Sequence, residues 1–125
     1  MGDFKQLEVW KIAKDLAVYI YTLTKQNDFN KDFGLRDQIR KAAISISSNI
    51  SEGDESGTNK MCVRYLHIAK GSNAEIQTQT IIANEIGYIS NKEKDYILLQ
   101  CEIISKKLFN LIKYRSHTPN HKPQT

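Results

Sequence analysis

The residues of this chain that could bind a metal are few, and their spacing does not suit a metal site. A di-iron centre in a helical bundle needs Glu-x-x-His on two helices, so that carboxylate and imidazole share an inward face. No glutamate here is followed three residues later by a histidine, and His117 and His121 lie close to the C-terminus. His67 falls on the polar side of the helix expected at 59–86, away from its apolar stripe, as a surface histidine does. We therefore expect no metal site and no cofactor.

The serines and glycines do not have the setting of a catalytic site either. Four serines lie within residues 45–51, in a segment with helical periodicity. A nucleophile elbow instead places its serine between a strand and a helix. Gly53 and Gly57 match neither the dinucleotide nor the P-loop spacing that lets backbone amides cradle a phosphate. The sequence therefore predicts that the protein is not an enzyme and has no catalytic residues.

Polar side chains fall on the apolar stripe of the helix expected at 59–86. A buried carboxylate is costly unless it is paired or protonated. Glu75 therefore needs a partner, and Arg36 or Arg40 is expected to supply it. Two interpretations stay open: a buried polar lock that fixes helix register, or a polar pocket or channel lining. The residues of this group are Ser72, Glu75 and Gln79, together with Asn49 on the second expected helix as a possible donor to Glu75.

The basic residues offer a second candidate site. The chain carries a formal net charge of +4, which favours acidic partners such as nucleic acid. On a monomer these residues are usually a solvated face, whereas on an oligomer each patch repeats and its phosphate contacts add. No helix-turn-helix, zinc finger or aromatic RNA-binding motif is visible, so sequence-specific recognition is not expected. The candidate phosphate contacts are Arg36, Arg40, Arg64, Lys106, Lys107 and Lys113.

These side chains must be positioned by helices, because the whole chain has helical periodicity. No proline occurs before Pro119, so long helices are uninterrupted. Short polar breaks at about 26–34, 53–58 and 87–91 force neighbouring helices to run antiparallel. The sequence thus predicts an all-α domain over residues 1–115, an antiparallel up-down four-helix bundle, and a disordered polar tail over 116–125. The expected helices cover about 7–25, 34–52, 59–86 and 90 to the start of the tail.

Local signals fix the ends of these helices. Asp32 and Thr58 are suited to cap the N-termini of the second and third helices with their side-chain oxygens. Gly87 is suited to the left-handed position after the third helix. Ser90 and Glu93 have the spacing of a capping box at the start of the fourth.

The first and fourth helices are more apolar than one buried face requires. Apolar residues of the first helix cover an arc of roughly 200°, against about 100° or somewhat more for a helix with one buried side. The fourth has a second stripe that includes Tyr96 and Leu99. Exposed apolar surface of this extent usually marks an interface, so we expect self-association through these two helices. The alternative is that long helices bend, which widens a stripe without exposing it.

Nothing in the sequence indicates export or a membrane. The N-terminal segment has no apolar export region, and no apolar run approaches the roughly 20 residues that span a bilayer. Cys62 and Cys101 lie far apart and lack CxxC spacing. They are expected to be reduced thiols in the core of a cytoplasmic protein with no membrane partner.

Four motifs carry a resemblance to a known family. They are Phe4-Lys5-x-Leu7-x-Val9-Trp10-x-x-Ala13, Gly34-Leu35-x-x-Gln38-Ile39-Arg40-Lys41-Ala42-Ala43, Ser45-Ile46-x-x-Asn49-Ile50-x-Glu52-Gly53 and Ala69-x-Gly71-Ser72-x-x-Glu75-x-x-Thr78-Gln79. Over about residues 4–112 the chain resembles the bacterial four helix bundle proteins, also called 23S rRNA intervening-sequence proteins. Ser47 is a departure, because the family usually has proline there, and its absence is expected to straighten the second helix.

The resemblance implies a homopentameric barrel with a central channel, built from up-down four-helix bundles. Many members are encoded within 23S rRNA genes, and the resemblance implies no enzymatic activity. A related accessory protein of diversity-generating retroelements binds nucleic acid and a reverse transcriptase through a basic surface. The leading hypothesis is therefore a homo-oligomer, a ring-shaped pentamer, that binds RNA or DNA backbones through repeated basic surfaces. The alternative is a scaffold or accessory subunit that recruits a protein partner.

Overall fold

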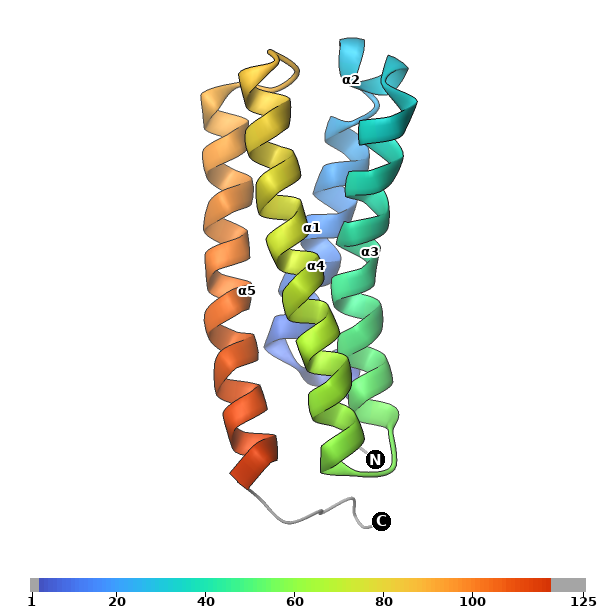
Figure 1. The fold of residues 1–125 in the computed structure, drawn as a ribbon, viewed down its shortest axis with the longest axis vertical. Helices are drawn as coiled ribbons and strands as arrows, with labels where there is room; N and C mark the ends of the chain where they lie inside the picture. The colour runs from blue at the N-terminus through green and yellow to red at the C-terminus, as the bar shows by residue number, and fades with distance from the viewer. Residues whose placement is uncertain (1–2, 118–125) are drawn as a thin grey trace.

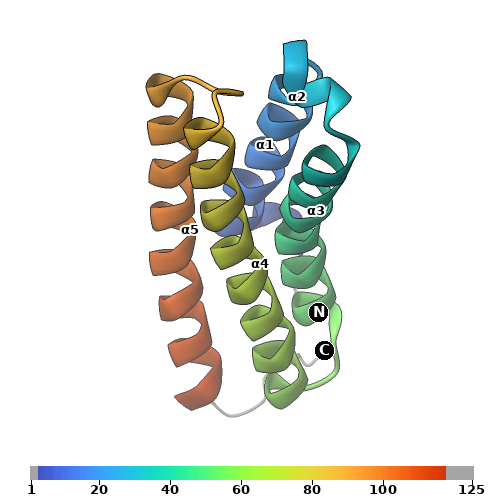
Figure 2. The ribbon, with the colours of Figure 1, turned by 45° about the horizontal axis from the view of Figure 1, so that its top comes forward.

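The computed structural model describes residues 3–117, and over this range the chain is all-α, as the sequence predicted. Four long helices stand side by side and run alternately in opposite directions (Figure 1). Helices α1 and α4 each pack against both α3 and α5, which places the four at the corners of a square (Figure 2). In chain order the elements are a 3-10 turn η1 (Phe4–Gln6), α1 (Glu8–Leu23), α2 (Asn27–Lys31), α3 (Phe33–Glu55), α4 (Asn59–Glu85) and α5 (Asn91–His117).

The predicted capping residues of the helices are confirmed. The Thr58 hydroxyl accepts a hydrogen bond from the Met61 amide at 3.1 Å, which caps α4. Ser90 and Glu93 each accept from the other's amide, at 3.1 and 2.9 Å, as a capping box does. Gly87 has φ +89° and ends α4 in the left-handed region that a side chain disfavours.

Asp32 joins two interhelical connections at one end of the bundle as well as capping α3 (Figure 1). One of its carboxylate oxygens accepts from the Leu35 amide at 3.0 Å, and the other accepts from the Tyr88 hydroxyl at 2.9 Å. Both hydrogen bonds lower the pKa of Asp32 below its usual value of 3.8, and the bond from the Leu35 amide has the larger effect. The Tyr88 ring also lies 5.3 Å from that of Phe29, between centroids. The loop between α4 and α5 is thereby held against α2 and the start of α3.

The structure differs from the prediction where a break was expected after residue 52. Helix α3 continues to Glu55, and it is unbroken at Ser47, where the family usually has proline. Gly53 is a buried helical residue rather than part of a loop. A Cβ atom built there would lie 3.1 Å from the Tyr65 Cβ and 3.2 Å from the Cys62 carbonyl oxygen. Glycine therefore allows α3 and α4 to approach closely at this point.

Alanine substitutions at Gly53 and Gly71 are expected to act in opposite directions. Gly71 is an exposed residue inside α4 with open space around it, so Gly71→Ala should raise the free energy of unfolding by roughly 0.5–1 kcal/mol. Gly53→Ala should lower it, because the new methyl group must push α3 and α4 apart. Urea unfolding of both variants measures the difference, and equal stabilisation would contradict the close approach.

The core is built mainly from isoleucine, leucine and alanine side chains, and the two cysteines lie within it. Cys62 and Cys101 are both buried, as predicted for core thiols. Burial raises the pKa of Cys101 to about 12, so its thiol is protonated at neutral pH.

The excess apolar surface lies only partly where the sequence predicted it: the fourth long helix, α5, exposes apolar side chains as expected, whereas the first does so little. The wide apolar stripe of α1 packs against other parts of the same chain. Trp10 packs edge-on against Phe4, with 5.3 Å between ring centroids, and the ring centroids of Tyr19 and Tyr96 lie 4.6 Å apart. Among the described large apolar residues of α1, Val18 is the exposed one. Most of the exposed large apolar residues lie on α4 and α5, and α3 adds Phe33 and Ile44. Those of the hairpin are Met61, Ile68, Ile81 and Ile82 on α4, Ile86 just after it, and Tyr96, Leu99, Phe109 and Tyr114 on α5.

Helix α5 also runs slightly further than predicted. It continues to His117, so the first two residues of the expected tail are helical, and residues 118–125 lie outside the described range. None of the helices in residues 3–117 is long and apolar enough to cross a bilayer.

Candidate nucleic-acid interface

The predicted polar group lies on the contact between α3 and α4, with one exception. Ser72 donates to the Ser45 hydroxyl at 2.8 Å, and the Asn49 amide donates to the Ser45 carbonyl at 2.8 Å. Further along, the Gln79 amide lies 3.4 Å from its acceptor on Gln38. The Ser72–Ser45 and Gln79–Gln38 hydrogen bonds join α4 to α3 at two levels, which fits a register-fixing role, whereas the Asn49 bond lies within α3.

Glu75 is the exception, and the prediction of a buried carboxylate there was wrong. Its side chain is exposed, so it needs no buried cation. The helical wheel placed it beside Ile76, but the buried side of α4 is centred on residues such as Leu66, Asn73 and Thr80. Glu75 therefore lies beyond the edge of the buried arc.

Arg36 and Arg40, the cations expected to pair with Glu75, have partners of their own. Arg36 donates to the Asn30 carbonyl at 3.0 Å, and its guanidinium lies 4.7 Å from the centre of the Phe33 ring. Arg40 donates to the Thr24 hydroxyl at 2.8 Å and lies 4.7 Å from the Tyr21 ring. Both arginines tie the start of α3 to α1 and α2, at the end of the bundle where α4 finishes (Figure 1).

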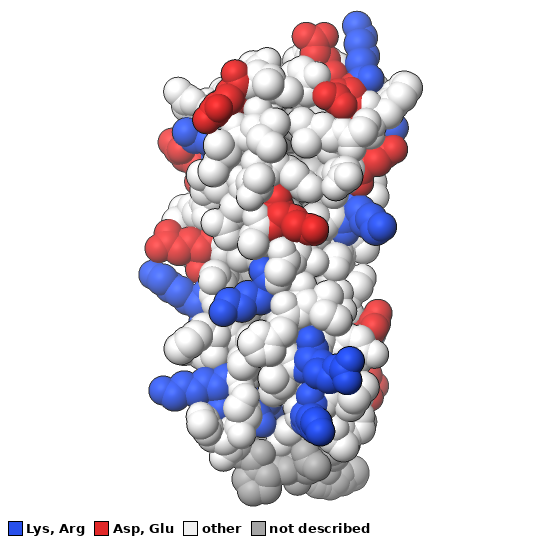
Figure 3. Space-filling view, viewed as in Figure 1, with Lys and Arg blue, Asp and Glu red and all other residues white. Residues whose placement is uncertain are grey.

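The hairpin of α4 and α5 is strongly segregated in charge. Residues 59–74 and 103–117 hold seven lysines and arginines and no acidic residue, whereas 75–85 and 91–102 hold five acidic residues and two lysines. Because α4 and α5 are antiparallel, the two basic segments lie side by side. Lys and Arg side chains accordingly predominate over the lower part of this face (Figure 3). We call residues 59–74 and 103–117 the basic half of the hairpin.

Two of these seven cations are held by acidic residues of other helices. The Lys107 ammonium lies 2.6 Å from the Glu8 carboxylate, and this hydrogen bond holds the pKa of Glu8 below its usual value. Arg115 is paired with Asp54 at 3.0 Å. The remaining five are exposed. Within residues 3–117, Lys106 is the one of these five that forms an ion pair, with Glu102 at 3.4 Å. They are Lys60, Arg64, Lys70, Lys106 and Lys113.

The six predicted phosphate contacts therefore do not form one surface. Arg64, Lys106 and Lys113 lie together in the basic half and are exposed. Lys107 lies on the side of α5 that faces α1, where it contacts Glu8. Lys60 and Lys70 were not among the candidates, although the absence of acidic residues around them in the sequence could have indicated them.

The surface of the basic half is hollowed between its two helices. One hollow of about 380 Å³ is lined by Lys70, Ser105, Lys106, Phe109 and Asn110. A second, of about 420 Å³, is lined by Asn59, Lys60, Val63, Arg64, Arg115 and Ser116. Cations from both helices thus border concave surface, where an extended anionic chain gains contacts on two sides.

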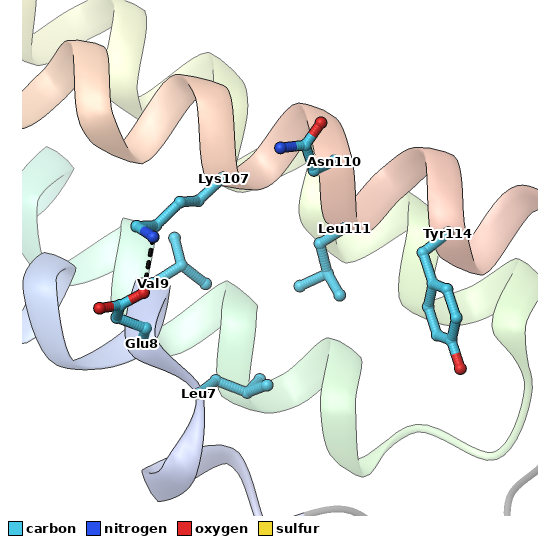
Figure 4. Close-up of a pocket in the computed structure, with 7 residues that line it drawn as sticks. All are labelled: Leu7, Glu8, Val9, Lys107, Asn110, Leu111 and Tyr114. Carbon is cyan, nitrogen blue, oxygen red and sulfur yellow. Dashed lines mark hydrogen bonds and ion pairs between the residues drawn. The ribbon is translucent and has the colours of Figure 1, made fainter.

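A third hollow is of a different kind. It lies between α1 and α5, has a volume of about 360 Å³, and presents Leu7, Val9 and Leu111 around its floor (Figure 4). The Lys107–Glu8 pair stands at its edge. This hollow lies at the beginning of α1, where the C-terminal part of α5 continues past the first residue of the shorter helix.

Two interior polar contacts were missed from the sequence. Arg115 donates to Asp54 at 3.0 Å and to Asn59 at 3.1 Å, and the Asp54 side chain is only 5% exposed. The Asn73 amide donates to the Cys101 carbonyl at 3.0 Å. Asp54 and Asn73 both sit at positions that continue an apolar stripe, and a polar residue at such a position was the signal available.

Within the described residues, no three His, Cys, Asp or Glu side chains lie close enough together to hold a metal ion. The fold and the surface thus define a class: a protein of four long helices in which one half of a helical hairpin carries exposed cations and no acidic residue. The sequence profile of the 23S rRNA-intervening sequence proteins matches residues 5–110, and the chain belongs to that family.

Comparison with solved structures supports the same fold. The chain is similar to a protein from Bacteroides thetaiotaomicron, described as being of unknown function and from the S23 ribosomal protein family. The TM-score is 0.77 at 24% sequence identity, over 84% of this chain and 98% of the other. At that identity the likeness bears on the fold alone. A comparison with curated proteins gave no match.

Proposed function

We propose that this protein is a non-enzymatic, homo-oligomeric bundle protein that binds RNA or DNA backbones through the basic half of its hairpin. The observation that carries the proposal is the segregation of charge: seven cations and no acidic residue on two adjacent helical segments. Five of these cations are exposed, so they are available to phosphates. A surface of this kind binds the backbone without sequence preference, because lysine and arginine contact phosphates wherever they occur.

Dependence on salt tests this proposal. About five phosphate contacts per chain predict a slope of log K against log salt near −3.5 for a single strand, which is roughly a 100-fold loss of affinity between 50 and 200 mM. Fluorescence anisotropy with a labelled oligonucleotide measures the slope. A slope near zero would contradict binding through phosphates.

Self-association is the second part of the proposal, and the exposed apolar side chains of α4 support it. Met61, Ile68 and Ile82 fall in one row at multiples of seven residues, the spacing at which helices pack along each other, and the exposed Glu75 lies in the same row between Ile68 and Ile82. Their exposures are 40%, 51% and 45%, more than a partner-free surface usually presents in one row. We propose a ring-shaped pentamer, the number that the family resemblance implies.

Charged substitutions in this row are expected to dissociate the oligomer. Ile68→Asp with Ile82→Asp should give a single-chain mass by light scattering while the helical circular-dichroism spectrum is kept, because both side chains are exposed in the protomer. Val18→Asp on α1 is the matched control, since Val18 is 59% exposed on a different helix. An unchanged mass for the double variant would remove α4 as the interface.

A second candidate function is recruitment of a protein partner. The hollow between α1 and α5 favours it, because its apolar floor resembles the grooves that accept apolar side chains. Binding of this kind depends weakly on salt, so the same titration separates the two functions.

A further inference from the structure

Phe109 has no place in the proposed binding of phosphates, yet it lies at the centre of the basic half. Its side chain is 58% exposed, the largest exposure among the described large apolar residues of α4 and α5. It lines the hollow between these helices together with Lys70 and Lys106. An exposed aromatic ring with lysines on either side presents a flat apolar face beside positive charge, which suits a partner that is both aromatic and anionic.

The surroundings of Phe109 constrain what covers it. On α5, Lys106 lies about one turn before it and Lys113 about one turn after it, and Lys70 lies across the hollow on α4. A second copy of this face would bring like charges together, which disfavours a symmetric contact through Phe109. The α4 row of Met61, Ile68 and Ile82 is a separate surface, because Phe109 lies on the side of α5 that borders Lys70.

We propose that the basic half binds single-stranded nucleic acid, with an unpaired base stacked on the Phe109 ring and the flanking phosphates held by Lys70, Lys106 and Lys113. This inference rests on the proposed function and deepens it by naming the form of nucleic acid. Stacking platforms in single-strand-binding proteins combine an exposed aromatic ring with cations that follow the backbone. A base within a duplex is stacked on its neighbours and cannot cover the ring, so phosphates alone would hold a duplex.

The hollow beside Phe109 suits single-stranded nucleic acid for a second reason. It is lined by Ser105 and Asn110 as well as by the lysines and the ring. A hydroxyl and an amide can donate to or accept from a base edge or sugar hydroxyl beside the stacked base. The stacked base remains unspecified, since every base presents a face to the ring.

Phe109→Ala tests the inference on the full chain, with Phe109→Trp to restore stacking and Leu99→Ala as the matched control. Leu99 is 52% exposed on the same helix but lies outside the basic half. Affinities are measured by anisotropy for one sequence as a single strand and as a duplex, and the mass of each variant is measured by light scattering. Phe109→Ala should weaken single-strand binding by roughly tenfold. Duplex binding and mass should be unchanged, tryptophan should restore affinity, and Leu99→Ala should have no effect.

Each other outcome is decisive. If Phe109→Ala binds the single strand as tightly as the wild type, the inference fails and backbone binding still stands. If it lowers the mass of the oligomer, Phe109 is a subunit contact and the inference also fails. If the wild type binds neither nucleic acid at low salt, the proposed function fails with it.

Discussion

Replacing the five exposed cations of the basic half by glutamine is expected to weaken nucleic-acid binding by roughly 100-fold or more at 50 mM salt. Each lost contact leaves counterions on the phosphates instead of releasing them, so the salt slope should fall close to zero as well. Glutamine is shorter than lysine or arginine but keeps these exposed side chains polar, and the fold should be unaffected. The substituted residues are Lys60, Arg64, Lys70, Lys106 and Lys113.

A control with the same change in net charge separates local contacts from overall attraction. Five lysines elsewhere in the chain are equally exposed and can be changed to glutamine together. This control variant should keep its salt slope and lose only a few-fold in affinity, because distant exposed charges are screened beyond about 10 Å at 0.1 M salt. Equal losses in both variants would show that net charge, not the basic half, causes binding. The control residues are Lys11, Lys25, Lys31, Lys41 and Lys92.

The second large effect is expected at the ion pair between Asp54 and Arg115. The two side chains are 5% and 16% exposed, and they join the end of α3 to the end of α5. Asp54→Ala leaves the largely buried Arg115 guanidinium without its carboxylate partner, which lowers the free energy of unfolding by about 3 kcal/mol. For a chain of this size, the melting temperature should then fall by on the order of 10 °C.

Two further variants check the cause of this loss. Asp54→Asn keeps an oxygen that can accept from Arg115 at the 3.0 Å position, so its cost should be clearly smaller than that of alanine. Combining Asp54→Ala with Arg115→Met should cost less than the sum of the single changes, because the stranded charge is gone. A loss below about 0.5 kcal/mol for Asp54→Ala would be typical of an exposed ion pair and would contradict this assignment.

The helix ends could be predicted from sequence because capping is local. The bonds of Thr58, Ser90 and Glu93 all close over three residues, so the sequence spacing contains the geometry. The interior of α4 was harder, because both its buried and its exposed arcs mix polar and apolar residues. A wheel alone could not show that Asn73 is buried and that Ile68 and Glu75 are exposed.

The candidate interface shows the same limit at longer range. The sequence contains the charge segregation, but only the antiparallel pairing of α4 and α5 brings residues 59–74 beside 103–117. Arg36 and Arg40 looked equally suitable in sequence. The fold around α2 brings Arg36 against the Phe33 ring and Arg40 against the Tyr21 ring. A guanidinium stacked on an aromatic ring is less free to contact a phosphate.

Photocross-linking of a labelled single-stranded oligonucleotide, with mass spectrometry of the linked peptides, locates nucleic acid on the chain most directly. At low salt the cross-links should fall within residues 59–74 and 103–117, and Phe109 should be among the linked residues. They should disappear when the five exposed cations of these segments are replaced by glutamine. Cross-links confined to α1 and α3, or spread evenly over all four long helices, would contradict binding through the basic half.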